Sequence, residues 1–148
     1  MPQTNETVAE QLKTYLADTY LLLAKTQACH WNARGPNFIG IHKLTEEQYN
    51  ELFEAVDELA ERVRALDTDA PFSLAEIQRI ATLEEATQVH GIDDAIRMLG
   101  SDNKAMSERA RELALDADEQ DDLVTHDMLV ARIEVHDKAA WLLRSNLA

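Results

Sequence analysis

The fold is decided by residues 52–71, which read LFEAVDELAERVRALDTDAP. Apolar residues recur in this stretch at alternating steps of four and three, which is the spacing of one buried face of an α-helix. The polar run from Asp67 to Pro71 ends that helix, because proline cannot be accommodated in a helix interior. We therefore expect a helix from about Asn37 to Leu66. Its apolar seam consists of Leu52, Val56, Leu59, Val63 and Leu66.

The same periodicity recurs in three other segments. It predicts helices from about Thr4 to Ala33, from Ile92 to about Ala117 with a bend at Gly100, and from about Thr125 to Leu147. Only four Gly and three Pro interrupt the chain. A composition rich in good helix formers with so few breakers predicts an all-α protein.

The connections between these helices predict the topology. Gly35-Pro36 makes a tight corner, so the first two helices are antiparallel neighbours. The second and third helices are separated by about 25 residues, in which Ser73 and Glu76 form a capping box that opens a short helix. We expect an all-α, ferritin-like four-helix bundle with a short extra helix in the long crossover between helices two and three. Residues 1–148 are expected to form one such domain.

Composition narrows the classes of function. The 148 residues include one Cys, and 28 acidic residues stand against 14 basic ones, a net charge of −14. A single Cys excludes an internal disulfide, and the chain shows neither a signal peptide nor an apolar run long enough to span a membrane, so we expect a cytoplasmic protein. The negative charge disfavours nucleic acid and favours cations.

The five histidines of the chain do not fit the Glu-x-x-His motif, which supplies intrachain di-iron ligands in ferritin-like bundles. None has Glu three residues upstream, so the sequence excludes a di-iron site of that kind. The upstream residues are Gln27 before His30, Ile39 before His42, Thr87 before His90, Leu123 before His126 and Ile133 before His136.

A different set of metal-binding residue types lies near the first corner. His30 ends the first helix, His42 and Glu46 lie one turn apart on the second, and Asp57 and Glu61 form another such pair. Imidazole with carboxylate suits iron or zinc. His42 and Asp57 are roughly 22 Å apart along one helix, so they cannot share a metal within one chain. Because these side chains also point away from the apolar seam, we expect an antiparallel two-fold dimer to bring the pairs together.

A set of short motifs is spread along nearly the whole chain: HWNARGPNF at 30–38, Ile41-His42, Tyr49, DELAER at 57–62, Asp122 with Thr125 and Asp127, and Asp137-Lys138 with Trp141 and Leu143. Together these motifs resemble the signature of the Dps family, the mini-ferritins that form iron-storing and DNA-binding shells.

This resemblance implies a homo-oligomer of twelve subunits built from two-fold dimers. It implies that iron is oxidised, preferentially by hydrogen peroxide, at ferroxidase centres shared between subunits, with two Fe per centre and zinc as a substitute. The catalytic and metal ligands would be His30, His42 and Glu46 of one subunit with Asp57 and Glu61 of its partner. Glu46 departs from the Asp of many relatives, which lengthens this arm by one methylene, so we expect the second, weaker metal position to be shifted.

Further roles follow from the same resemblance. Trp31 falls where the family keeps a tryptophan near the centre, as a packing residue or an electron donor. Asp122 and Asp127 match positions lining the pores through which Fe(II) enters the shell. Candidate sites for mineral nucleation are Glu47, Glu51 and Glu54.

Two other functions stay open at this point. DNA compaction is the alternative that the family name invites, but the first basic residue is Lys13 and the chain carries no basic tail, so DNA binding is disfavoured. A bundle that binds iron or zinc without turnover has the same ligand pattern. Iron storage and detoxification, protecting against oxidative damage, is the function that we expect.

Overall fold

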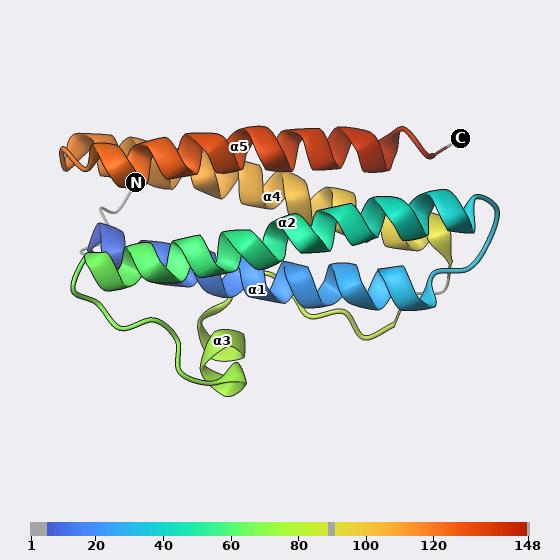
Figure 1. Ribbon diagram of the computed structural model, residues 1–148, viewed down its shortest axis with the longest axis horizontal. Coiled ribbons are helices and arrows are strands. Elements are labelled where there is room, and N and C mark those ends of the chain that lie inside the picture. Colours follow the sequence, from blue (N-terminus) through green and yellow to red (C-terminus); the bar gives the residue numbers. More distant parts are fainter. Residues whose placement is uncertain (1–5, 89–90, 148) are drawn as a thin grey trace.

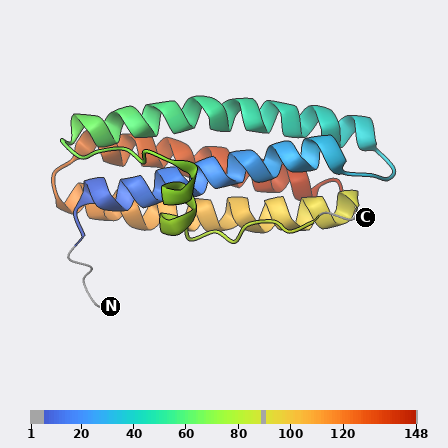
Figure 2. The ribbon, with the colours of Figure 1, turned by 90° about the horizontal axis from the view of Figure 1, so that it is seen from below.

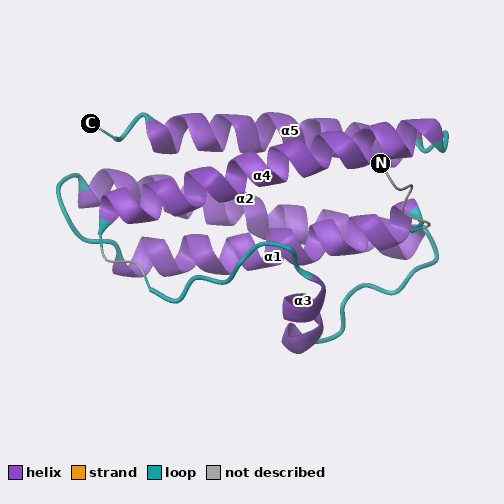
Figure 3. Cartoon of the chain, turned by 180° about the vertical axis from the view of Figure 1, so that it is seen from behind, coloured by secondary structure: helices purple, strands orange, loops and turns teal. Residues whose placement is uncertain are grey.

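Five α-helices and no strand make up the part of the chain that this computed structural model describes, residues 6–88 and 91–147 (Figures 1 and 3). The four long helices and the expected short helix in the crossover are all present. They are α1 (Val8–Asn32), α2 (Phe38–Ala65), α3 (Leu74–Ile80), α4 (Ile92–Glu119) and α5 (Leu123–Arg144).

The long helices pack in two antiparallel pairs, α1 with α2 and α4 with α5, and α1 also packs on α4. The crossover carrying α3 runs back along the bundle, from the end of α2 to the start of α4 (Figures 1 and 2). Inward-facing apolar residues from the four long helices form one core. Its fully buried members include Leu12, Leu22, Ile41, Leu59, Ile96, Leu99, Met106, Leu129 and Leu143.

Helix ends follow local capping chemistry. Thr7 and Glu10 cap each other reciprocally, so α1 begins at Val8, later than the expected start near Thr4, which lies outside the described residues. Asp122 caps α5, which therefore begins at Leu123, two residues before the expected Thr125. As expected, α4 continues through Gly100. Among the described residues, no helix combines the length and apolarity needed to cross a membrane.

Two buried charges on α1 hold the crossover. Asp18, fully buried, accepts hydrogen bonds from the backbone N–H groups of Thr82 (2.6 Å) and Leu83 (2.9 Å), from the Thr82 hydroxyl (2.6 Å), and from Arg109 (2.5 Å). Lys25, also buried, forms an ion pair with Asp102 on α4 (2.6 Å) and donates a hydrogen bond to the Glu84 carbonyl in the crossover (2.7 Å). Thr82 therefore anchors the crossover to α1.

Candidate metal centre

The corner between α1 and α2 brings His30 and His42 into direct contact. Their rings stack with centroids 3.6 Å apart and planes 14° apart. Nδ1 of His30 lies 2.7 Å from the carbonyl oxygen of His42, and Nδ1 of His42 lies 2.7 Å from the carbonyl oxygen of His30. Because a carbonyl only accepts hydrogen bonds, each Nδ1 carries the proton and donates it. Each Nε2 is then left with a lone pair, the state in which histidine binds metals.

Two neighbours on α2 support this pair. The Thr45 hydroxyl donates to the Ile41 carbonyl at 2.7 Å and lies 3.3 Å from Nδ1 of His30. The Tyr49 ring meets the His30 ring edge-on, with centroids 5.1 Å apart. His30 is thereby buried between His42 and Tyr49. The supporting role of Thr45 was missed from the sequence, where its position one turn after His42 was the only signal.

The three predicted carboxylates lie apart from the histidines. Glu46, Asp57 and Glu61 are all exposed on α2. In the described part of the chain, no three His, Cys, Asp or Glu side chains lie close enough to hold a metal ion. One chain therefore assembles the histidine half of the expected ligand set and leaves the carboxylate half at the surface.

Large apolar side chains are exposed around these ligands. Phe53 is 68% exposed and Ile39 61% exposed on the carboxylate-bearing side of α2. Trp31 follows His30 and is 66% exposed, and it lines a small surface pocket of about 320 Å³ with Phe38. Exposed aromatic residues beside charged ones are typical of a surface that another molecule covers.

The two predicted pore residues differ in their surroundings. Asp122 accepts hydrogen bonds from the backbone N–H of Thr125 (3.0 Å), from the Thr125 hydroxyl (2.6 Å) and from Arg62 (2.7 Å). Burial works against the charged form, yet these hydrogen bonds lower the pKa of Asp122 below its usual value. Asp127 is exposed one turn later. Asp122 thus has a structural task at this turn, whereas Asp127 is available to solvent.

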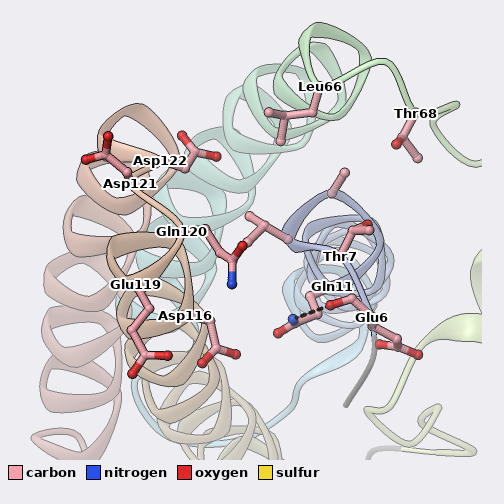
Figure 4. Close-up of a pocket in the computed structure, with 12 residues that line it drawn as sticks. Glu6, Thr7, Gln11, Leu66, Thr68, Asp116, Glu119, Gln120, Asp121 and Asp122 are labelled. Atoms are coloured by element: carbon pink, nitrogen blue, oxygen red, sulfur yellow. Dashed lines mark hydrogen bonds between the residues drawn. The ribbon is translucent and has the colours of Figure 1, made fainter. Parts of the chain in front are cut away.

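An open pocket of about 870 Å³ lies beside this turn, between the start of α1 and the end of α4 (Figure 4). Its wall on the α4 side is acidic, with Asp116, Glu119, Asp121 and Asp122. Glu6, just before α1, and Gln11 on α1 line the opposite side, and the Gln11 side-chain amide donates a hydrogen bond to the Glu6 carbonyl (3.2 Å). A wall of acidic side chains creates a negative electrostatic potential, which attracts cations to the pocket.

The other histidines are placed differently. His136 is fully buried and hydrogen-bonded. His126 is half-buried, and its Nδ1 donates to the Ala114 carbonyl at 2.8 Å. His90 lies outside the described residues. Trp141, one of the residues that carry the family resemblance, is 57% exposed and lies outside the core.

The family model of the ferritin-like domain matches residues 9–148. An uncharacterized low temperature-induced protein of Nostoc sp., all0458, is 38% identical over 93% of this chain and 78% of its own length. The DNA protection during starvation protein of Brevibacillus brevis is 35% identical over 95% of this chain and 94% of its own length.

The fold is shared with solved structures. That of a Dps protein from Vibrio cholerae O1, described as a member of a broad superfamily of ferritin-like diiron-carboxylate proteins, matches with a TM-score of 0.90. The two chains are 26% identical, and the match covers 95% of this chain and 89% of that one.

Proposed function

Because the chain belongs to the Dps family of the ferritin-like superfamily, we propose that it oxidises Fe(II) and stores the ferric product in a hollow shell of identical subunits. Iron storage and protection of DNA are the general functions of this family.

One observation carries the proposal: the reciprocal hydrogen bonds of His30 and His42 (2.7 Å each) leave two adjacent Nε2 lone pairs without a proton. A core histidine has no need of this arrangement, because it would use both ring nitrogens to satisfy its own hydrogen bonds. Fixing Nδ1 on a carbonyl is the usual way in which a protein orients a metal-binding imidazole. The pair therefore supports a binding site for a metal ion with a preference for nitrogen and oxygen ligands.

Symmetry supplies the missing carboxylates. The four ligand positions on α2 lie symmetrically about the point between residues 51 and 52. A two-fold axis through that point places His42 opposite Glu61 of the partner subunit. It likewise places Glu46 opposite Asp57 of the partner subunit. One dimer would then hold two complete centres.

Phe53 lies less than one turn from the same point and is 68% exposed. Burying this ring against the second copy of α2 removes a large apolar surface from water, which favours association. We propose that Phe53 is the central apolar contact of the dimer, with the two metal centres on either side.

Each ligand then has a defined task. His30 and His42 bind as neutral imidazoles, and Asp57 and Glu61 of the partner subunit add negative charge, which favours Fe(III) over Fe(II). Glu46 completes the shell at the second, weaker position, and zinc occupies the same ligands as a competitor. Two Fe(II) each give one electron to one hydrogen peroxide. The O–O bond breaks, two protons are taken up and two water molecules form, so no hydroxyl radical is released.

The stored iron needs an entry and a nucleation surface. We propose twelve subunits in the shell, with Asp127 lining the entry pores and Asp122 holding the pore-side turn through its bond to Arg62 (2.7 Å). Glu47 and Glu54 are exposed on α2 and are suited to nucleation, whereas Glu51 is engaged by Arg132.

Anaerobic Fe(II) loading followed by hydrogen peroxide tests the function. We expect ferric absorbance to grow with two Fe(II) consumed per peroxide in the parent protein. A variant with His30→Ala and His42→Ala should lose this reaction. Metal binding with no ferric signal in the parent would instead favour a protein that binds metal without turnover.

Binding to DNA is the second candidate, favoured by a row of exposed cations on α4. Arg97, Lys104 and Arg111 recur every seven residues, so they share one face of the helix. Glu108 interrupts the row and the net charge is −14, so we expect weak, salt-sensitive binding at most. A gel-shift titration across salt and magnesium, repeated with Lys104→Glu, tests it.

A further inference from the structure

Arg132 is a cation buried at the centre of the bundle. Its side chain is 8% exposed, and its Nη1 donates to Oε2 of Glu51 on α2 at 2.5 Å. Its Nη2 donates to Nε2 of His136 on α5 at 3.2 Å. A carboxylate on α2 and an imidazole nitrogen on α5 thus both accept hydrogen bonds from one positive group.

Asn103 on α4 determines which nitrogen of His136 faces the guanidinium. The Asn103 Nδ2 donates to the Leu99 carbonyl at 2.8 Å, so the Asn103 Oδ1 faces Nδ1 of His136, also at 2.8 Å. Nδ1 of His136 therefore carries the proton, and Nε2 presents its lone pair to Arg132. Burial, together with the charge of Arg132, lowers the pKa of His136 to about 3, so the ring is neutral. A neutral imidazole oriented through its Nδ1 is also how proteins prepare a metal ligand.

The cluster has more polar atoms than the guanidinium uses. A cavity of about 260 Å³ between α2 and α5 is bordered by Gln48, Glu51, Asn103 and His136. Both side-chain polar atoms of Gln48, the Oε1 of Glu51 and the Nε of Arg132 itself are buried without a hydrogen-bond partner. Buried polar atoms without partners are rare, and in a cavity they are positioned to bind something.

We propose that this cluster is a cation site whose cation is supplied by the chain itself, so that the Arg132 guanidinium keeps divalent metals out of the bundle. Its donors are the Glu51 carboxylate, the His136 imidazole and the Gln48 amide oxygen, a set that suits zinc, cobalt or iron once the guanidinium is removed. The consequence for iron rests on the proposed function: oxidation is confined to the centres shared between subunits, because the interior of each bundle is already occupied.

Cobalt binding to the full-length Arg132→Ala protein tests the inference, because Co²⁺ reports its own ligands through visible absorption bands. We expect about one more Co²⁺ bound per chain than in the parent, with bands typical of nitrogen and oxygen ligands. Adding Glu51→Gln or His136→Ala to Arg132→Ala should remove the extra ion. Arg109→Ala is the matched control: it also frees a buried carboxylate, Asp18, but that group is held by three hydrogen-bond donors and should gain no Co²⁺.

Methylguanidinium provides a second readout. It should compete with Co²⁺ for the Arg132→Ala protein and raise its Tm, while leaving the Tm of the parent and of Arg109→Ala unchanged. If Arg132→Ala is unfolded when purified, Zn²⁺ or methylguanidinium should restore its helical circular dichroism. A folded variant with no extra Co²⁺, or an unfolded one that neither cation restores, would overturn the inference. Since every comparison is made against the parent without iron, a failed ferroxidase assay would not affect the result.

Discussion

The histidines at the α1–α2 corner and at the bundle centre share one hydrogen-bond pattern at Nδ1 and differ in what faces Nε2. At the α1–α2 corner and at the bundle centre alike, Nδ1 of each histidine donates to a fixed oxygen. At the centre, Nε2 of His136 faces the Arg132 guanidinium. At the corner, the hydrogen bonds of His30 and His42 in the structure are made by Nδ1, which leaves the Nε2 lone pairs for a metal ion. What faces the second nitrogen therefore separates a structural histidine from a candidate metal ligand.

The largest expected effect comes from breaking the central contact. Arg132→Met leaves the Glu51 carboxylate without its cation and His136 without its donor. We expect a loss of about 2 to 4 kcal/mol in the free energy of unfolding, below the range for fully buried pairs because Glu51 is 38% exposed. Urea denaturation at fixed protein concentration measures it.

A double variant sharpens that result. Glu51→Leu together with Arg132→Met replaces both charges by apolar groups of similar size, so at least half of the lost stability should return. If the double variant is less stable than Arg132→Met alone, the charges are not the source of the loss.

At the corner, the effect should fall on chemistry rather than on stability. His30→Ala or His42→Ala removes one lone-pair donor, and we expect the rate of peroxide-driven Fe(II) oxidation to fall about 100-fold. Stopped-flow ferric absorbance measures the rate. His136→Ala is the comparison, since it should lower the Tm while leaving the rate per folded chain within about two-fold. Equal rate losses in the corner and core variants would remove the distinction.

The sequence predicted elements whose signals are local. The α2 helix and its seam follow from residues 37–66 alone, and the histidines were found because helix spacing places them at one corner. It could not predict contacts set by chain geometry at a distance. The reciprocal bonds depend on how the corner turns, with Asn37 in the left-handed region at φ 64°. From the sequence, Glu51 was a candidate for mineral nucleation. Its pairing with Arg132 could not be predicted, because the two residues are 81 positions apart in the chain.

Acid should weaken the bundle through its core histidine. The pKa of His136 is about 3 in the folded protein and near its ordinary 6.5 when unfolded. Between those values the unfolded chain binds a proton that the folded chain excludes, so stability falls as pH falls. The slope contributed by this residue is up to about 1.4 kcal/mol per pH unit.

A neutral replacement isolates this contribution. His136→Gln cannot take up the proton, so its stability should depend less on pH than that of the parent between about pH 6.5 and 3. Urea midpoints across that window measure both proteins. Carboxylates such as Asp122 titrate in both, and their share cancels in the difference. Identical slopes would show that His136 is not the source.

The smallest expected effect is a loss of metal affinity when Thr45, the neighbour of His30, is changed. Thr45→Val removes the hydroxyl 3.3 Å from Nδ1 of His30 but leaves the stronger bond to the His42 carbonyl in place. Loss of a supporting partner typically weakens metal affinity by about 10 to 100-fold, and here we expect about three- to ten-fold because the main acceptor remains. Zinc calorimetry measures the affinity. Thr26→Val is the matched control: Thr26 is equally buried in α1, and its hydroxyl donates to the Leu22 carbonyl at 2.7 Å. A loss of affinity in Thr45→Val that Thr26→Val does not share would locate the effect at the histidine pair, whereas equal losses would assign it to helix packing.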